Sequence, residues 1–163
     1  MEHGCHSSHA AAAGEKKHLS SARVQADSNS VRSVVVVDDS EIIADTLVMV
    51  LSAEGFQAVA AYSASHALKL LQAGSFDVLI TDVMMPGMTG IELAIEVTRR
   101  GLVSAVLLMS GVASTADLLE NARKLGYTFE ILAKPIYPTE VIERVHTLLA
   151  LGDGAPEIPD SAA

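Results

Sequence analysis

The sequence predicts an α/β fold built around a parallel sheet of five short strands. Apolar runs of strand length recur between residues 33 and 133, and a stretch with helical periodicity follows each run. This alternation is typical of βα units, in which helices cover both faces of the sheet and the strands are therefore apolar throughout. Half of the 163 residues are hydrophobic, which is enough to fill one core. Neither an internal repeat nor a second domain is visible, so we expect a single three-layer sandwich.

Each element has its own signal in the sequence. We expect strands near residues 33–37, 57–61, 76–81, 105–110 and 129–133. Glycine follows the helical stretches, as it does at many helix ends, because it adopts the left-handed conformation without strain. We expect helices from the candidate N-cap Ser40 to Gly55, at about Ala64–Ala73, at about Ile91–Arg100, at about Ser114–Leu125, and from Pro138-Thr139 to about Leu151.

Composition and charge exclude several classes of function. The formal net charge of −9 disfavours a non-specific nucleic-acid binder, which needs a basic face. No run approaches the roughly 18 apolar residues of a membrane span, and the N-terminus has no apolar core of the signal-peptide kind. The single cysteine, Cys5, cannot form an internal disulfide, which suits a reducing compartment. We therefore expect a soluble, cytoplasmic protein that binds neither nucleic acid directly nor a membrane.

Both ends of the chain differ from the middle. Residues 1–31 are rich in Ser, Ala and His without apolar periodicity, and residues 152–163 carry Gly, Pro and acidic side chains. We predict a disordered N-terminal arm, a folded domain over residues 32–151 and a flexible C-terminal tail. Four metal-capable side chains in the arm lack the closed spacing of a zinc site, and we interpret them as part of a flexible leader: His3, Cys5, His6 and His9.

Four of the expected strands end in polar or charged side chains. Asp38-Asp39 follow the first strand and Asp82 the third, while Ser110 ends the fourth and Lys134 follows the fifth. The carboxyl ends of parallel strands share one edge of the sheet, where ligands bind in open α/β folds. Clustered carboxylates repel one another unless a cation is present, and oxygen ligands suit Mg²⁺. An ammonium and a hydroxyl suit phosphoryl oxygens, so the sequence predicts a site for a divalent cation and a phosphoryl group.

The same residues, in this order and spacing, resemble the receiver domain of bacterial two-component response regulators. The matching set is Asp38-Asp39, the run from Asp82 to Gly90 (Asp-Val-Met-Met-Pro-Gly-Met-Thr-Gly), Ser110-Gly111 and Lys134-Pro135. The resemblance covers about residues 32–151. It implies a flavodoxin-like, doubly wound sheet of five parallel strands in the order 2-1-3-4-5 with five helices. It also implies a cis peptide bond between Lys134 and Pro135.

The resemblance implies a role for each group. Asp82 would be the phosphoacceptor, a carboxylate nucleophile that takes a phosphoryl group from a phosphohistidine. Mg²⁺ would be held by Asp39, Asp82 and the backbone carbonyl of Met84, with Asp38 acting mainly through water. Lys134 would offset charge on the phosphoryl group. Ser110, the hydroxyl of the site, would turn toward that group after transfer and move its loop and the neighbouring helix.

One position departs from the family's usual pattern of signalling. Receivers usually carry an aromatic residue three positions before the lysine, and here that position holds Ile131. Tyr127 and Phe129 lie nearby but out of register with it. We therefore do not expect a ring at this position to carry the signal.

The residues after Asp82 bear on turnover. Met84 and Val112, two positions beyond Asp82 and Ser110, cannot orient a water by hydrogen bonding, so we expect slow self-dephosphorylation. Val83 and Met84 offer no second acid/base residue, which disfavours a hydrolase of phosphomonoesters. We expect a protein that catalyses only its own Mg²⁺-dependent phosphorylation and is not a turnover enzyme on external substrates.

These observations favour a phosphorylation-switched signalling module. It would receive its phosphoryl group from a sensor histidine kinase or a histidine phosphotransfer protein and then bind an unknown downstream protein. Only a short tail follows the last helix, so we expect the stand-alone, single-domain type of receiver. An intermediate phosphate carrier in a multi-step phosphorelay is an alternative that the sequence does not separate from this one. A constitutive scaffold is disfavoured because all five site side chains are present.

Two surfaces are candidates for partner contacts. Ile42, Ile43 and Asp45 of the first helix are expected to bear on the choice of kinase. The face made by the fourth helix, fifth strand and fifth helix is the contact surface that the resemblance implies. Four apolar side chains belong to it, although leucines at helical spacing are more often core: Leu118, Leu119, Ile136 and Tyr137.

Overall fold

Five parallel strands lie in the order β2-β1-β3-β4-β5 in the computed structural model, which describes residues 31–111 and 115–151. This is the predicted doubly wound, flavodoxin-like topology. The strands are β1 (Ser33–Val37), β2 (Gln57–Ala61), β3 (Val78–Asp82), β4 (Ala105–Ser110) and β5 (Glu130–Ala133). The helices are α1 (Glu41–Ala53), α2 (Ala64–Ala73), α3 (Gly90–Arg99), α4 (Ala116–Lys124) and α5 (Pro138–Ala150).

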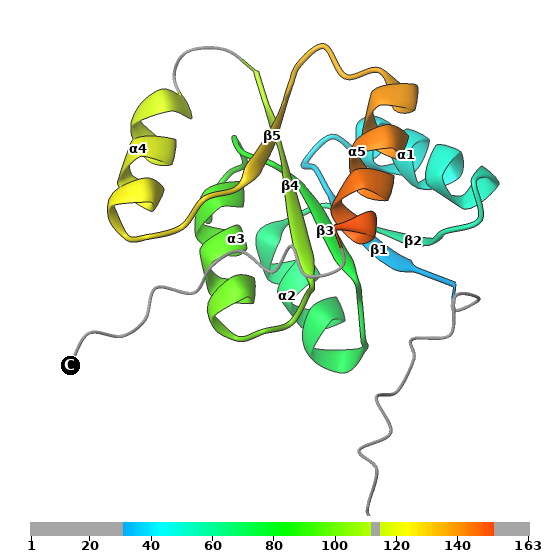
Figure 1. Ribbon diagram of the computed structural model, residues 1–163, viewed down its shortest axis with the longest axis horizontal. Coiled ribbons are helices and arrows are strands. Elements are labelled where there is room, and N and C mark those ends of the chain that lie inside the picture. The colour runs from blue at the N-terminus through cyan, green and yellow to red at the C-terminus, as the bar shows by residue number, and fades with distance from the viewer. Residues whose placement is uncertain (1–30, 112–114, 152–163) are drawn as a thin grey trace, which may run out of the picture. The chain divides into compact units, whose positions relative to one another are not determined.

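The helices cover the sheet in two layers (Figure 1). α1 and α5 pack on one face, whereas α2, α3 and α4 pack on the other. Side chains alternate between the faces along a strand. Val34 and Val36 of β1 therefore join the α1/α5 core, while Val35 and Val37 join the core under α2, α3 and α4. All four are fully buried, which explains the unbroken valine run in the sequence.

Three strands have the predicted bounds, and two begin later than predicted. β3 begins at Val78 rather than residue 76, and Asp77, just before it, contacts the start of β1 through its side chain. Its carboxylate accepts a hydrogen bond from the Ser33 backbone N at 2.8 Å and pairs with Arg32 at 3.2 Å. β5 begins at Glu130, one residue later than predicted. β3 also ends one residue later than predicted, at Asp82, so that this site residue is the last of its strand, whereas β5 ends at Ala133 as predicted.

The starts of the helices differ in how their backbone amides are capped. The Ser63 hydroxyl caps α2, and Thr89 forms a capping box with Glu92 at the start of α3. Ser40 occupies the predicted N-cap position of α1, but its side chain makes no cap hydrogen bond. Its backbone N instead donates to Asp38 Oδ1 at 2.8 Å. The start of α1 is thereby fixed to a carboxylate of the candidate site.

The predicted arm over residues 1–31 and tail over 152–163 lie outside the described residues, apart from Val31. The assignments of His3, Cys5, His6 and His9 to a flexible leader therefore stay predictions. Val112 and Ser114 also lie outside the described part of the chain. Among the residues that the structure describes, no helix has both the length and the apolar character needed to cross a membrane.

Gly90 begins α3 where the chain passes very close to the end of β3. A Cβ at this position would lie 1.9 Å from the backbone O of Asp82 and 3.0 Å from Thr81 Oγ1. The backbone N of Gly90 donates to the O of Val83 at 2.9 Å, which closes the loop between them. Only a residue without a side chain allows this approach, so Gly90 fixes the path of the loop that follows β3.

We predict that Gly90→Ala destabilises the domain, because the added methyl group meets backbone atoms that cannot yield. The free energy of unfolding, measured by urea denaturation, should fall by about 2–4 kcal/mol. Gly111→Ala is the matched control, since its Cβ would meet its nearest neighbour, Lys134 Cδ, at an ordinary 3.6 Å. The control should change stability by no more than about 0.5 kcal/mol. Equal losses in the two variants would contradict this account of Gly90.

Candidate functional site

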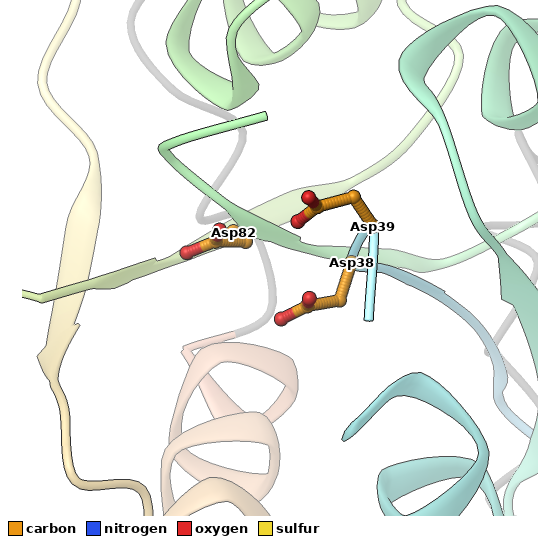
Figure 2. Close-up of side chains that lie close together, drawn as sticks. All are labelled: Asp38, Asp39 and Asp82. Atoms are coloured by element: carbon orange, nitrogen blue, oxygen red, sulfur yellow. The ribbon is translucent and has the colours of Figure 1, made fainter. Parts of the chain in front are cut away.

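The register of the sheet brings the predicted carboxylates together. β1 and β3 are neighbours, and Val37 is paired with Thr81. The residues that follow this pair, Asp38 and Asp82, therefore reach the edge of the sheet at the same level. Figure 2 shows their side chains gathered there with that of Asp39, and one carboxylate oxygen of each residue lies within 4.8 Å of the others. Asp38 and Asp82 are buried, whereas Asp39 is exposed.

Lys134 supplies the positive charge of the cluster. Its Nζ lies 2.9 Å from Asp82 Oδ1 and 3.5 Å from Asp38 Oδ2. The backbone N of Lys134 donates to the O of Ser110 at 2.8 Å, which holds the end of β5 beside the end of β4. The Lys134-Pro135 peptide bond is cis, as predicted. All the predicted side chains of the site thus come from strand ends at one edge of the sheet.

Burial and charge act in opposite directions on the acidity of these groups. Burial raises the pKa of Asp82, and the charges of Asp38 and Asp39 raise it as well, whereas the hydrogen bond and charge of Lys134 lower it. The net pKa of Asp82 lies above its ordinary value. Burial lowers the pKa of Lys134, but its hydrogen bonds and charge interactions with Asp82 and Asp38 outweigh this and raise it. Lys134 is therefore a cation throughout the ordinary pH range, and ionised Asp82 has a free-energy cost.

The residues present fit a magnesium ion. Asp38 Oδ2 is buried, and the Lys134 ammonium lies 3.5 Å from it but closer to Asp82, at 2.9 Å. A desolvated carboxylate oxygen with so long a contact is incompletely satisfied, which is costly. A divalent cation would satisfy it, and a set of oxygen donors is what Mg²⁺ prefers. Asp38, Asp39 and Asp82 would provide the carboxylates. That the backbone carbonyl of Met84, in the loop after β3, is a further ligand of the ion stays a prediction.

Ser110 ends β4 at the same edge, and its hydroxyl has a neighbour that the sequence analysis did not identify. Ser110 Oγ lies 2.6 Å from the hydroxyl of Thr115, and both residues are buried. Next to Ser110, a Cβ at Gly111 would make only ordinary contact with Cδ and Cβ of Lys134, so the space that glycine leaves lies beside the aliphatic part of that side chain. Ser110 thus ends its strand at the edge of the sheet that also carries the carboxylates and the ammonium.

Comparison with known proteins agrees with this geometry. The family model described as the response regulator receiver domain matches residues 34–146. The chain belongs to this family. The match includes every predicted site residue. It also includes all five strands, except for Ser33, the first residue of β1. The family assigned from the motifs is therefore confirmed, together with a place in two-component signalling.

Curated relatives of the receiver are longer proteins. Protein PetR of Rhodobacter capsulatus is 31% identical over 116 residues, which cover 71% of this chain and 48% of PetR. A putative transcriptional regulator of Haloferax volcanii is 36% identical over 131 residues, 79% of this chain and 21% of that protein. The chain thus spans about half or less of the length of these relatives. The single-domain type stays a prediction.

Solved receiver structures share the fold over their whole length. The chemotaxis protein CheY4 of Vibrio cholerae matches with a TM-score of 0.65 and 26% identity, covering 73% of this chain and 99% of CheY4. The response regulator TrrA of Thermotoga maritima, solved in complex with Mg(2+)-BeF, matches with a TM-score of 0.63 and 27% identity. That match covers 72% of this chain and 99% of TrrA.

Ile131 occupies the position on β5 that usually holds an aromatic residue, and its packing differs from that of the two aromatic rings nearby. Ile131 is paired with Leu108 of β4 and packs, half-buried, against the core under α2, α3 and α4. Tyr127 and Phe129 precede β5 and stack on each other, with ring centroids 6.1 Å apart and planes 9° apart. Tyr127 is itself buried. The two rings therefore pack together outside the strand, and an aliphatic side chain takes the usual aromatic position.

The predicted contact surfaces differ in exposure. Ile42 is 80% exposed and lines a hollow of about 180 Å³ with Ile43, Thr46, Leu47, Ile136 and Pro138. Asp45 instead accepts a hydrogen bond from the Tyr62 hydroxyl at 2.8 Å, which raises the pKa of Tyr62. On the other candidate surface Leu118 and Leu119 pack against the core, whereas Tyr137 is exposed. The core interpretation of these two leucines holds.

Sequence reasoning missed some contacts of the receiver. Thr115 could have been found as the residue just before a helical stretch, where hydroxyl side chains are common. Two histidines also make ring contacts. His146 lies 5.1 Å from Phe56 between ring centroids, and His66 lies 6.2 Å from Tyr62. Phe56 and His146 are far apart in the sequence, so no local pattern points to that pair, whereas Tyr62 and His66 are neighbours at the start of α2.

We predict that Asp82→Asn raises the free energy of unfolding in the absence of Mg²⁺. A carboxyl whose pKa is higher in the folded state destabilises the fold when ionised, and this cost is present above the raised pKa and vanishes as the pH falls through it. At pH 7.5 the gain should be about 1 kcal/mol in urea denaturation. Wild type, but not the variant, should also gain thermal stability when Mg²⁺ is added.

Asp77→Asn is the matched control for this prediction. The Asp77 carboxylate accepts hydrogen bonds from Ser33 and pairs with Arg32, so its replacement should lower stability. The same chemical change is thus expected to have opposite signs at the two positions. A loss of stability in Asp82→Asn without Mg²⁺ would show that the carboxylate is favourably placed and would contradict the prediction.

Proposed function

We propose that this protein is a phosphorylation-switched signalling module that accepts a phosphoryl group on Asp82 and then binds a downstream protein. The observation that carries this proposal is the Lys134 ammonium 2.9 Å from Asp82, in a cluster with Asp38 and Asp39. A carboxylate nucleophile needs nearby positive charge to offset the charge of the group it attacks. The Mg(2+)-BeF complex of the similar receiver TrrA supports the same chemistry for this site.

The transfer would proceed by direct displacement. A carboxylate oxygen of Asp82 forms a bond to the phosphorus of a phosphohistidine as the bond between phosphorus and imidazole nitrogen breaks. The electron pair of the broken bond stays on the imidazole, and the product is an acyl phosphate on Asp82. Lys134 is placed to offset negative charge on the phosphoryl oxygens, so the contribution of the chain is mainly positioning and electrostatics. Bound Mg²⁺ would supply the remaining charge neutralisation.

The same arrangement argues against turnover on external substrates. The loop after Asp82 presents Val83, which is buried, and Met84, whose thioether cannot act as a general base. We therefore take the protein to be a switch rather than an enzyme. The phosphoryl donor would be a sensor histidine kinase or a histidine phosphotransfer protein. Exposed apolar side chains around Ile42 lie on α1, which begins directly after the Asp38-Asp39 pair, and would suit an apolar partner surface.

We predict that acetyl phosphate with Mg²⁺ adds one phosphoryl group to the protein. Intact mass should rise by about 80 Da in wild type and not in Asp82→Asn. Asp77→Asn, which removes a carboxylate outside the site, should gain the same mass as wild type. EDTA should abolish the gain in every variant. Phosphorylation of Asp82→Asn to the wild-type extent would place the acceptor elsewhere and overturn the proposal.

We further predict that phosphorylated Asp82 is long-lived, because the side chain two positions beyond it, Met84, does not activate water. Met84 is 51% exposed near the site and offers only a weak acceptor. Met84→Asn supplies an amide that can orient a water, and the half-life of the acyl phosphate should shorten about tenfold. Met88→Asn changes an exposed methionine of the same loop and is the control. A wild-type half-life of only seconds would contradict the prediction.

A further inference from the structure

The start of α4 differs from the starts of α2 and α3. Thr115 occupies its N-cap position but makes no cap hydrogen bond, whereas Ser63 and Thr89 both cap their helices. The backbone explains the difference. Ser63 and Thr89 have ψ angles of 159°, in the extended region that capping requires, but Thr115 has φ −92° and ψ −10°. The Thr115 side chain is thus of a type that can cap the first amides of α4, but its backbone conformation is not the one that capping requires.

The Thr115 hydroxyl is directed to Ser110 instead. The two hydroxyl oxygens lie 2.6 Å apart, with Ser110 8% exposed and Thr115 4% exposed. A buried hydroxyl that loses its partner has a free-energy cost, so this pair fixes the side chain of Ser110 while no stronger partner is present. With its present backbone angles Thr115 places its hydroxyl against Ser110, whereas the extended capping conformation would direct the hydroxyl to the first amides of α4.

A phosphoryl group on Asp82 would be that stronger partner. Asp82 is paired with Met109, and Val83 N donates to the O of Met109 at 2.9 Å, so Ser110 is the next residue of β4 beyond the acceptor. Hydrogen bonds to anionic oxygens are roughly twice as strong as those between neutral groups. The Ser110 hydroxyl would therefore donate to a phosphoryl oxygen in preference to Thr115.

We propose that Thr115 is a positioning residue that exchanges partners with the phosphorylation state of Asp82, an inference that rests on the function proposed above. In the unphosphorylated protein its hydroxyl holds Ser110. When Ser110 turns to the phosphoryl group, Thr115 turns into the N-cap of α4 and accepts a hydrogen bond from the amide of Asp117 or Leu118. The first turn of α4 is thereby stabilised and re-aimed. With Ile131 in the usual aromatic position, this route passes the signal to α4 rather than through a ring on β5.

The exchange can be tested without any phosphoryl group. Ser110→Ala removes the competing partner, so Thr115 should cap α4 in the unphosphorylated protein. Hydrogen exchange at the amides of Asp117 and Leu118 should slow about fivefold relative to wild type, the effect of one side-chain cap. Adding Thr115→Val should return exchange to the wild-type rate, and adding Thr115→Ser should keep it slow. Thermal unfolding of each variant establishes that the comparison is between folded proteins.

A second experiment follows the exchange during phosphorylation with acetyl phosphate and Mg²⁺. In wild type the same two amides should slow about fivefold once intact mass shows one added group. Thr115→Val should gain the same mass without slowing, and its exchange before phosphorylation should equal that of wild type. A Thr115 with a merely structural role would instead alter exchange in both states.

The outcomes separate this inference from the proposed function. Exchange in Ser110→Ala at or above the wild-type rate would overturn the inference, whether or not Asp82 accepts a phosphoryl group. So would slowing that persists in the Ser110→Ala/Thr115→Val protein. Failure of wild type to gain mass would overturn the proposed function, whereas the Ser110→Ala result would still decide whether the two hydroxyls compete.

Discussion

Three carboxylates share one ammonium at the carboxyl edge of the sheet, and this imbalance governs the site. Asp38 and Asp82 are taken out of water at the ends of adjacent strands, and the pKa of Asp82 is raised above its ordinary value even though Lys134 pairs with it. Lys134 reaches across from the end of β5, at the far side of β4. The negative charge exceeds the positive charge, so the cluster favours a divalent cation before it can receive a further anionic group.

The backbone holds this unfavourable arrangement in place. Pairing of Val37 with Thr81 fixes the level of the two buried carboxylates, and the hydrogen bond from Lys134 N to Ser110 O fixes the end of β5. Gly90 closes the loop after Asp82 by letting α3 begin against the backbone carbonyl of Asp82. A two-layer core of buried aliphatic side chains supports these strands on both faces. The free energy gained by packing the core thus offsets the electrostatic cost of the clustered carboxylates at the edge of the sheet. Such costs are common at functional sites.

The sequence was sufficient for the topology and for the members of the site, because both follow from strand ends. Apolar runs mark the strands, and the residue after each run must lie at the shared edge, so Asp38, Asp82 and Lys134 could be placed without coordinates. Contacts between elements were beyond this logic. The hydrogen bond from Ser33 N to the Asp77 carboxylate joins residues 44 positions apart, and Ser40 holds the N-cap position of α1 without making a side-chain cap. The Ser110–Thr115 pair likewise depends on the path between β4 and α4 rather than on spacing.

The unequal anchoring of the helices determines which one a small change at Asp82 can move. α3 has a capping box and six buried residues, and Gly90 is wedged against β3. α4 has no side-chain cap, and only Ala122 of its residues is buried. A hydrogen bond from a hydroxyl to an anionic oxygen is worth about 1.5–3 kcal/mol. That is too little to displace α3, but it is comparable to the gain or loss of one cap, about 1 kcal/mol. Elements that respond to ligands come from the weakly held part of a fold. In this receiver α4 is such an element, and its first turn is joined to the site through the contact between Thr115 and Ser110.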